Sequence, residues 1–169
     1  VDMERILADI LPATGASYLL RERGEQAPTE ADRADVPVVL AEDSVTIRAV
    51  LSRELQRGGY QQLEAFDNGE SCHDALRERV ERARAEGRDP AAAVGIVVSD
   101  IEMPRMDGMT LCRRVKQDLG LSQVPVILFS SLINEQIARK CDSVGADAYI
   151  SKPRFNELLE MVDRHVFGG

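Results

Sequence analysis

Four short apolar runs of this sequence each end in side chains that could bind a metal ion or phosphate. Those side chains are, in chain order, an acidic pair, a single aspartate, a serine pair and a lysine: Glu42 and Asp43, Asp100, Ser130 and Ser131, and Lys152. If the runs are parallel strands, their carboxyl ends meet at one edge of the sheet, where open α/β sheets place their chemistry. Three carboxylates brought together there need a cation, and an all-oxygen cluster favours Mg²⁺.

The elements that position these side chains alternate between strands and helices. Strands are predicted over 36–41, 61–66, 94–100, 124–130 and 147–151. Helices are predicted over 44–57, from 69 to a stop at Gly87 and Pro90, over 108–118 and 134–144, and after Pro153. Because the strands are apolar throughout rather than at every second residue, they predict a doubly wound, five-stranded parallel sheet of the α/β class, covered on both faces.

The first 35 residues have a different pattern. Residues 1–20 contain apolar side chains at helical spacing, and residues 21–35 are polar and predict a linker. A helix of about ten residues is marginal in water, so we expect it to pack on something. The sequence leaves open whether this is the following domain, a second copy of it, or a domain absent from this chain.

Composition favours protein partners. The 169 residues suit one domain with an appendage, and 21 basic against 29 acidic residues give a net charge of −8. This charge argues against nucleic acid and anionic membranes as partners. The chain has no apolar run of the roughly 20 residues that span a bilayer and no signal-peptide pattern, so we expect a cytoplasmic location. Three cysteines without metal-ligand spacing are expected to be reduced core residues: Cys72, Cys112 and Cys141.

The order of side chains at the strand ends resembles the receiver domain of two-component response regulators, over roughly residues 36–167. The resemblance implies a flavodoxin-like (βα)5 fold for a receiver domain spanning 36–169. It also implies a role for each matching residue: Asp100 as the phosphate acceptor, Glu42 and Asp43 as the acidic pair, Ser130 as the switch hydroxyl, Tyr149 as the switch aromatic and Lys152 as the phosphate-binding lysine.

The same resemblance implies a magnesium-dependent switch. Asp43 and Asp100 would bind Mg²⁺ directly, together with the backbone carbonyl of Glu102, and Glu42 would act through a metal-bound water. Asp100 would take phosphate from a histidine kinase, with Lys152 pairing with the phosphoryl oxygens. Three further residues are expected to shape the loops of the site, the last through a cis peptide bond: Pro104, Gly108 and Pro153.

Three acids have simpler explanations. Glu42 and Asp43 could be an ordinary acidic pair beside a helix N-terminus, but that explanation accounts for only one of the four strand ends. Asp107 is expected to be a plain helix N-cap.

A narrower resemblance is to CheV-type chemotaxis proteins. Residues 1–10 resemble the closing segment of CheW-like coupling domains, and residues 100–108, with the lengthened second helix, resemble the CheV receiver. The implied partners are a CheA-like histidine kinase and, through a coupling domain ahead of residue 1, chemoreceptors. The chain starts with Val1 rather than Met, which leaves open whether it is a fragment. It ends soon after the fifth helix of the receiver, so an output domain, if any, is expected before residue 1.

Other functions fit the sequence less well. A receiver of another phosphorelay is the first alternative. A phosphohydrolase could use Asp100 as nucleophile and Glu102 as acid, but such enzymes usually have aspartate at the second position and need a substrate cap. A nucleotide-binding module is weaker still, because no glycine-rich phosphate loop follows any strand. We therefore expect a signalling switch that catalyses only its own phosphorylation and dephosphorylation.

Overall fold

The computed structural model describes residues 27–168. The helix expected within residues 1–20 and the first part of the expected linker, 21–26, lie outside the described residues.

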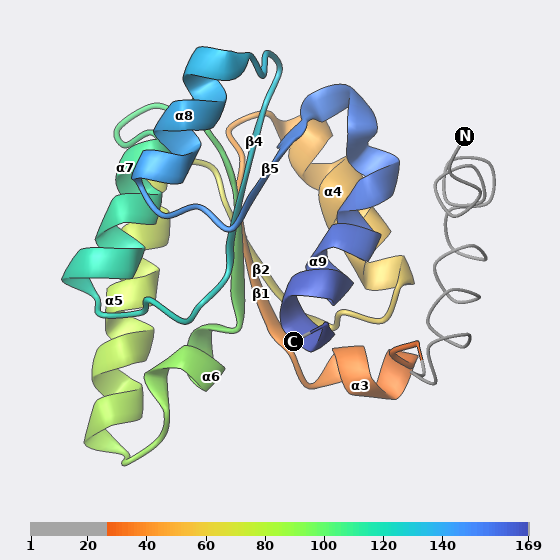
Figure 1. Ribbon diagram of the computed structural model, residues 1–169. Coiled ribbons are helices and arrows are strands. Elements are labelled where there is room, and N and C mark those ends of the chain that lie inside the picture. The colour runs from red at the N-terminus through yellow and green to blue at the C-terminus, as the bar shows by residue number, and fades with distance from the viewer. Residues whose placement is uncertain (1–26, 169) are drawn as a thin grey trace.

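The strands form one five-stranded parallel sheet, as the sequence predicted (Figure 1). Their order in the sheet is β2-β1-β3-β4-β5. Three central strands are almost entirely buried: β1 (Pro37–Ala41), β3 (Ile96–Asp100) and β4 (Val126–Ser130). The edge strands β2 (Gln62–Phe66) and β5 (Ala148–Ser151) are partly exposed. Continuous apolar sequence thus marks the strands that are covered on both faces.

Helices cover both faces of the sheet (Figure 1). One face carries α3 (Glu30–Ala34), α4 (Val45–Arg57) and α9 (Leu158–Phe167), the last preceded by the 3₁₀ segment η2 (Lys152–Glu157). The other face carries α5 (Gly69–Ala85), α6 (Pro90–Val94), α7 (Gly108–Arg113) with its π-helical continuation η1 (Arg114–Asp118), and α8 (Glu135–Ser143). None of the helices between residues 27 and 168 combines the length and apolar character of a membrane span.

The two faces enclose separate hydrophobic cores. Leu51 and Leu55 of α4 pack with Leu158 and Val162 of α9 in one core. The other core contains the three cysteines, all of them buried and free, as expected: Cys72, Cys112 and Cys141. Alternate residues of each central strand face alternate cores, so the sheet is buried as a middle layer.

Helix α6 was not expected. The sequence predicted that Pro90 ends the preceding helix, but Pro90 instead begins a new one, with the Asp89 side chain accepting a hydrogen bond from the Ala91 amide at 3.0 Å. The chain then turns into β3 at Gly95, which has φ +77°. A Cβ at Gly95 would lie 2.0 Å from the carbonyl oxygen of Pro37, so the turn requires glycine.

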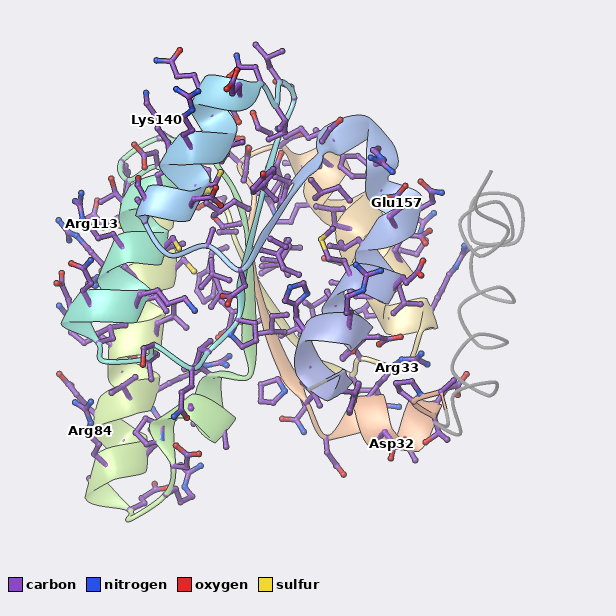
Figure 2. The ribbon with its side chains drawn as sticks, in the orientation of Figure 1. Asp32, Arg33, Arg84, Arg113, Lys140 and Glu157 are labelled. Atoms are coloured by element: carbon purple, nitrogen blue, oxygen red, sulfur yellow. The ribbon has the colours of Figure 1, made fainter. Side chains whose placement is uncertain are left out.

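Helix α3 lies within the expected linker. Thr29 and Asp32 form a capping box, in which each side chain accepts a hydrogen bond from the other residue's backbone amide. Arg33 of α3, labelled in Figure 2, forms a bidentate ion pair with Asp163 of α9, at 2.9 and 2.6 Å. It also donates to the Gly58 carbonyl at 2.9 Å. No residue of α3 is buried, so its sequence has no apolar periodicity to reveal it.

The expected cis bond before Pro153 is not found. The structure has no cis peptide bond among the residues it describes. Pro153 instead lies in the first turn of η2, a position that proline occupies readily.

The Arg33–Asp163 ion pair should stabilise the fold measurably. Both side chains are about 15% exposed, and Asp163 also accepts a hydrogen bond from the buried Tyr60 hydroxyl at 2.6 Å. Removing one partner leaves the other incompletely paired, so Arg33→Ala should lower the free energy of unfolding by about 1–3 kcal/mol in urea denaturation. The control is Arg88→Ala, which breaks an exposed pair with Glu86 and should cost less than about 1 kcal/mol. Equal effects would contradict a docked α3.

Candidate functional site

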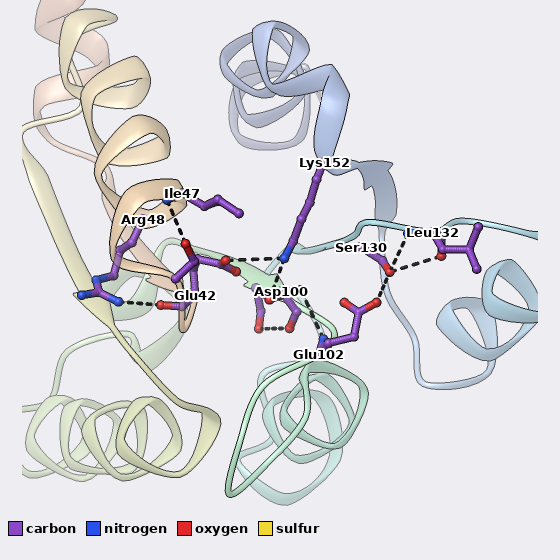
Figure 3. A network of polar contacts seen from close by, with 10 residues as sticks. Glu42, Ile47, Arg48, Asp100, Glu102, Ser130, Leu132 and Lys152 are labelled. Atoms are coloured by element: carbon purple, nitrogen blue, oxygen red, sulfur yellow. Dashed lines mark hydrogen bonds and ion pairs between the residues drawn. The ribbon is translucent and has the colours of Figure 1, made fainter.

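The candidate site lies at the carboxyl edge of the sheet, where the strand register brings its residues together (Figure 3). Asp100 ends β3 beside Phe129 of β4, and Ser130 ends β4 beside Ser151 of β5. The acidic pair follows β1, which neighbours β3, and Lys152 follows β5. Four neighbouring strands thus each supply polar groups to one place.

Local hydrogen bonds fix the backbone of Glu42. Its amide donates to the Phe66 carbonyl at 2.9 Å, which extends the pairing of β1 with β2 beyond the end of the strand. Its carbonyl accepts from Arg48 of α4 at 2.8 Å. No sequence pattern marks Arg48 as part of the site. Its position, four residues after the α4 N-cap Ser44, places it one turn into the helix above the strand end.

The loop after Asp100 depends on Gly108. A Cβ at this position would lie 2.1 Å from the Asp100 carbonyl oxygen, so only glycine allows α7 to begin so close to the strand. Asp107 caps α7, as expected, by accepting from the Thr110 amide at 2.7 Å. In the loop between Asp100 and Asp107, Arg105 has φ +67°. The Met106 amide donates to the Pro104 carbonyl at 2.8 Å, which closes a three-residue turn.

Buried charge dominates the electrostatics. The side chains of Glu42 and Asp100 are fully buried, and Lys152 Nζ lies 3.1 Å from Asp100 Oδ2 and 3.5 Å from Glu42 Oε1 (Figure 3). Burial, together with the neighbouring Glu42 and Glu102 carboxylates, raises the pKa of Asp100 to about 8, against the opposing effect of Lys152. Burial opposes the charge of Lys152, but its pairing with Asp100 and Glu42 outweighs that and raises the pKa of Lys152.

The acidic cluster fits a magnesium ion. One carboxylate oxygen from each of Glu42, Asp43 and Asp100 lies within 4.8 Å of the others. The second oxygen of Glu42, Oε2, is buried and has no hydrogen-bond partner among residues 27–168. A single lysine among these acids leaves excess negative charge, and hard oxygen donors with access to water suit Mg²⁺. The residues present therefore match the requirements of this ion.

Ser130 and Glu102 are joined by a direct hydrogen bond. Ser130 Oγ donates to Glu102 Oε1 and accepts from the Leu132 amide at 3.2 Å, and the Glu102 amide donates to Asp100 Oδ1 at 3.2 Å. Burial opposes ionisation of Glu102, but the hydrogen bonds from Ser130 and Asp100 outweigh it and lower its pKa. For a receiver, the sequence predicted a role only for the backbone carbonyl of Glu102, and the side chain was considered only as the acid of an alternative phosphohydrolase. The contact with Ser130 is additional.

Tyr149 lies apart from this polar network. It sits in β5 opposite Leu128, three residues before Lys152, and is 36% exposed. The structure thus brings together the predicted acids, serine and lysine, and places the predicted switch aromatic on the neighbouring edge strand.

Comparison with known proteins identifies the family. A sequence model described as the response regulator receiver domain matches residues 38–163. The chain belongs to the response regulator receiver domain family. Receiver domains are phosphorylation-dependent switches of two-component signalling rather than metabolic enzymes.

The curated relatives include chemotaxis proteins. "Chemotaxis protein CheV3" of Helicobacter pylori is 31% identical over 97% of this chain, and the match covers 49% of that protein. The chain therefore spans about half the length of this relative. "Two-component response regulator ORR3" of rice, Oryza sativa subsp. indica, is 32% identical over 69% of this chain and 80% of its own length.

Solved receiver domains share the fold. The receiver domain of the histidine kinase CKI1 from Arabidopsis thaliana, complexed with Mg²⁺ and BeF₃⁻, has a TM-score of 0.70 at 22% identity and covers 85% of this chain and 99% of its own. A similarity at this level of identity establishes the fold, and Mg²⁺ is a property of that crystal structure.

The raised pKa of Asp100 predicts a pH-dependent stability. Because its pKa is near 3.8 in the unfolded chain and about 8 in the fold, the native state holds more protons between those values. The metal-free receiver should therefore lose stability as pH rises from 5 to 8, by about 1–3 kcal/mol in denaturant titrations. Asp100→Asn should remove most of this loss, and added Mg²⁺ should offset it in the unmodified receiver.

The matched control is Asp107→Asn. Asparagine caps a helix as well as aspartate does, so this variant should keep the pH dependence of the unmodified receiver. A stability that rises with pH in the metal-free receiver would contradict the electrostatics described here.

Proposed function

We propose that this receiver accepts a phosphoryl group on Asp100 from a histidine kinase in a magnesium-dependent reaction. The observation that carries this proposal is the pairing of the buried Asp100 carboxylate with Lys152, inside a cluster of acids that fits Mg²⁺. An oxygen of Asp100 forms a bond to phosphorus while the bond from phosphorus to the histidine nitrogen breaks. The catalysis required is mainly positioning and charge neutralisation.

The residues of this chain divide those tasks. Lys152 pairs with Asp100 before the reaction and is placed to pair with phosphoryl oxygens afterwards. Ser130, at the end of the neighbouring strand, supplies a hydroxyl donor to the same group. Gly108 and the capped start of α7 hold the Asp100 backbone in place.

The proposed magnesium ligands are the carboxylates of Asp43 and Asp100 and the backbone carbonyl of Glu102, with Glu42 acting through a water molecule. When bound, the ion would neutralise negative charge on the acids and on the transferring group.

The proposed output is a change of protein contacts. The product is an acyl phosphate with close to two negative charges. Movement of Ser130 toward this group would open space for the Tyr149 ring, which is now partly exposed on β5. The surface formed by β4, α8 and β5 would then differ between the two states and be read by a partner.

The proposed setting is bacterial chemotaxis. The relatives that match 97% of this chain are named as CheV chemotaxis proteins, and a CheA-like histidine kinase would be the phosphate donor. Chemoreceptors would be engaged through a coupling domain ahead of residue 1. The net charge of −8 supports protein partners over nucleic acid or a membrane surface, and we propose a cytoplasmic location.

Phosphorylation can be tested with a small phosphate donor. Incubation with acetyl phosphate and Mg²⁺ should add the mass of one phosphoryl group to the intact chain, and the adduct should be absent from Asp100→Asn and after chelation of the metal. Asp107→Asn should still be labelled, because Asp107 only caps α7. Labelling of Asp100→Asn would contradict the assignment of the acceptor, and steady turnover of small phosphate esters would favour a phosphohydrolase.

The role of Lys152 predicts a rate effect. Lys152→Ala removes the positive charge nearest Asp100 and should slow labelling by acetyl phosphate by about tenfold to a hundredfold. Arg113→Ala removes an exposed positive charge from α7 and should leave the rate unchanged (Figure 2). Equal rates for Lys152→Ala and the unmodified receiver would contradict the proposed role.

A further inference from the structure

The Ser130 hydroxyl is already engaged in the unphosphorylated receiver. Its oxygen contacts two acceptors for its proton, Glu102 Oε1 and, at 3.2 Å, the Leu132 carbonyl, and it accepts from the Leu132 amide (Figure 3). The charged Glu102 carboxylate is the stronger of the two acceptors. A serine hydroxyl carries one proton and can donate only one such hydrogen bond at a time. Ser130 therefore cannot hold Glu102 and a phosphoryl oxygen together.

The competing acceptor is a strong one. Hydrogen bonds to a carboxylate are roughly twice as strong as those between neutral groups. Glu102 lies two residues after Asp100, and its amide binds the Asp100 carboxylate directly at 3.2 Å. A phosphoryl group on Asp100 would therefore bring about −1.5 to −2 charge close to Glu102. The Glu102 carboxylate would be repelled by the same group that attracts the Ser130 proton.

We propose that the Glu102 side chain is a latch that holds Ser130 in the unphosphorylated state and must release it before Ser130 can bind the phosphoryl group. The inference rests on the function proposed above and adds a positioning role for Glu102, which acts on the phosphoryl group only through Ser130.

The latch also connects the site to the surface. Ser130 is 1% exposed, whereas Leu132 is 64% exposed and begins the segment that leads into α8. Because Ser130 Oγ accepts from the Leu132 amide, release from Glu102 changes a hydrogen bond of that segment as well. Release of Ser130 from Glu102 would thus alter the proposed output surface formed by β4, α8 and β5.

The affinity for a phosphoryl mimic tests the latch. Beryllium trifluoride, added with Mg²⁺ and followed by NMR, should bind Glu102→Ala about three- to tenfold more tightly than the unmodified receiver, because no hydrogen bond to Glu102 has to break. Glu102→Gln keeps an acceptor oxygen but no charge, so its gain should be smaller. Unchanged or weaker binding by Glu102→Ala would overturn the latch.

Measuring the effect of Glu102→Ala in a chain that already carries Ser130→Ala distinguishes the latch from simple charge repulsion by Glu102. If Glu102 acts through Ser130, the Glu102→Ala change should bring little further gain in a chain that already carries Ser130→Ala. An equal gain in both backgrounds would overturn the proposal and assign the effect to repulsion between the Glu102 carboxylate and the anion.

A second measurement needs no phosphoryl chemistry. In the metal-free receiver, Glu102→Ala and Ser130→Ala should each shift the Leu132 amide resonance, and Glu102→Gln should shift it less. Glu86 is exposed and distant in sequence from the site, so Glu86→Ala should leave the Leu132 amide resonance unchanged. A Leu132 resonance unmoved by Glu102→Ala would overturn the latch. Failure of the unmodified receiver to bind the mimic, with the Leu132 shifts present, would instead count against the proposed function alone.

Discussion

The central constraint on this structure is the burial of negative charge at the carboxyl edge of the sheet. Glu42 and Asp100 are wholly buried there, Asp43 lies beside them, and Lys152 is the cation that pairs with both buried acids. Such an arrangement costs free energy, because one lysine compensates three carboxylates only in part. The fold tolerates that cost because its stability comes from two large apolar cores on either side of the sheet. The acids thereby stay together at the edge where we propose that a cation and a phosphoryl group bind.

The parallel register of the strands places the buried acids beside the groups with which they could react. Since all five strands run in the same direction, their carboxyl ends meet along one edge, and neighbouring strands supply groups of different chemistry. Small departures from this backbone geometry would be unfavourable. The approach of Gly108 to the Asp100 carbonyl leaves no room for a side chain, and Arg48 holds the carbonyl of Glu42 in place. Rigid strands and tight loops thus support a site in which Ser130 and Glu102 retain freedom to exchange partners.

Much of this architecture is readable from sequence because its signals are local. Apolar runs predicted the buried strands, and the polar residues that end them predicted which groups would meet. Helix α3 escaped notice because its stability comes from a capping box and the distant partner Asp163 rather than from an apolar stripe. Helix α6 has a sequence signal in Asp89-Pro90, an N-cap followed by proline, but a proline after a helical segment equally predicts the end of that helix. The Glu102–Ser130 contact depends on the direction of two side chains, one in the loop after β3 and one at the end of β4, which residue spacing does not encode.

The position of α3 bears on how a signal could leave this domain. Helix α3 precedes the first residue of β1 and therefore lies at the amino edge of the sheet, opposite Asp100 (Figure 1). Arg33 ties it to α9, whose chain leads back through η2 to Lys152 at the site itself. Lys152 is therefore connected to α3 through the backbone of η2 and α9 and through the Arg33–Asp163 ion pair. The Glu102–Ser130 contact has a separate route, through Leu132 toward α8. The two contacts therefore connect the proposed phosphorylation site to opposite faces of the sheet, one through α9 to α3 and the other toward α8.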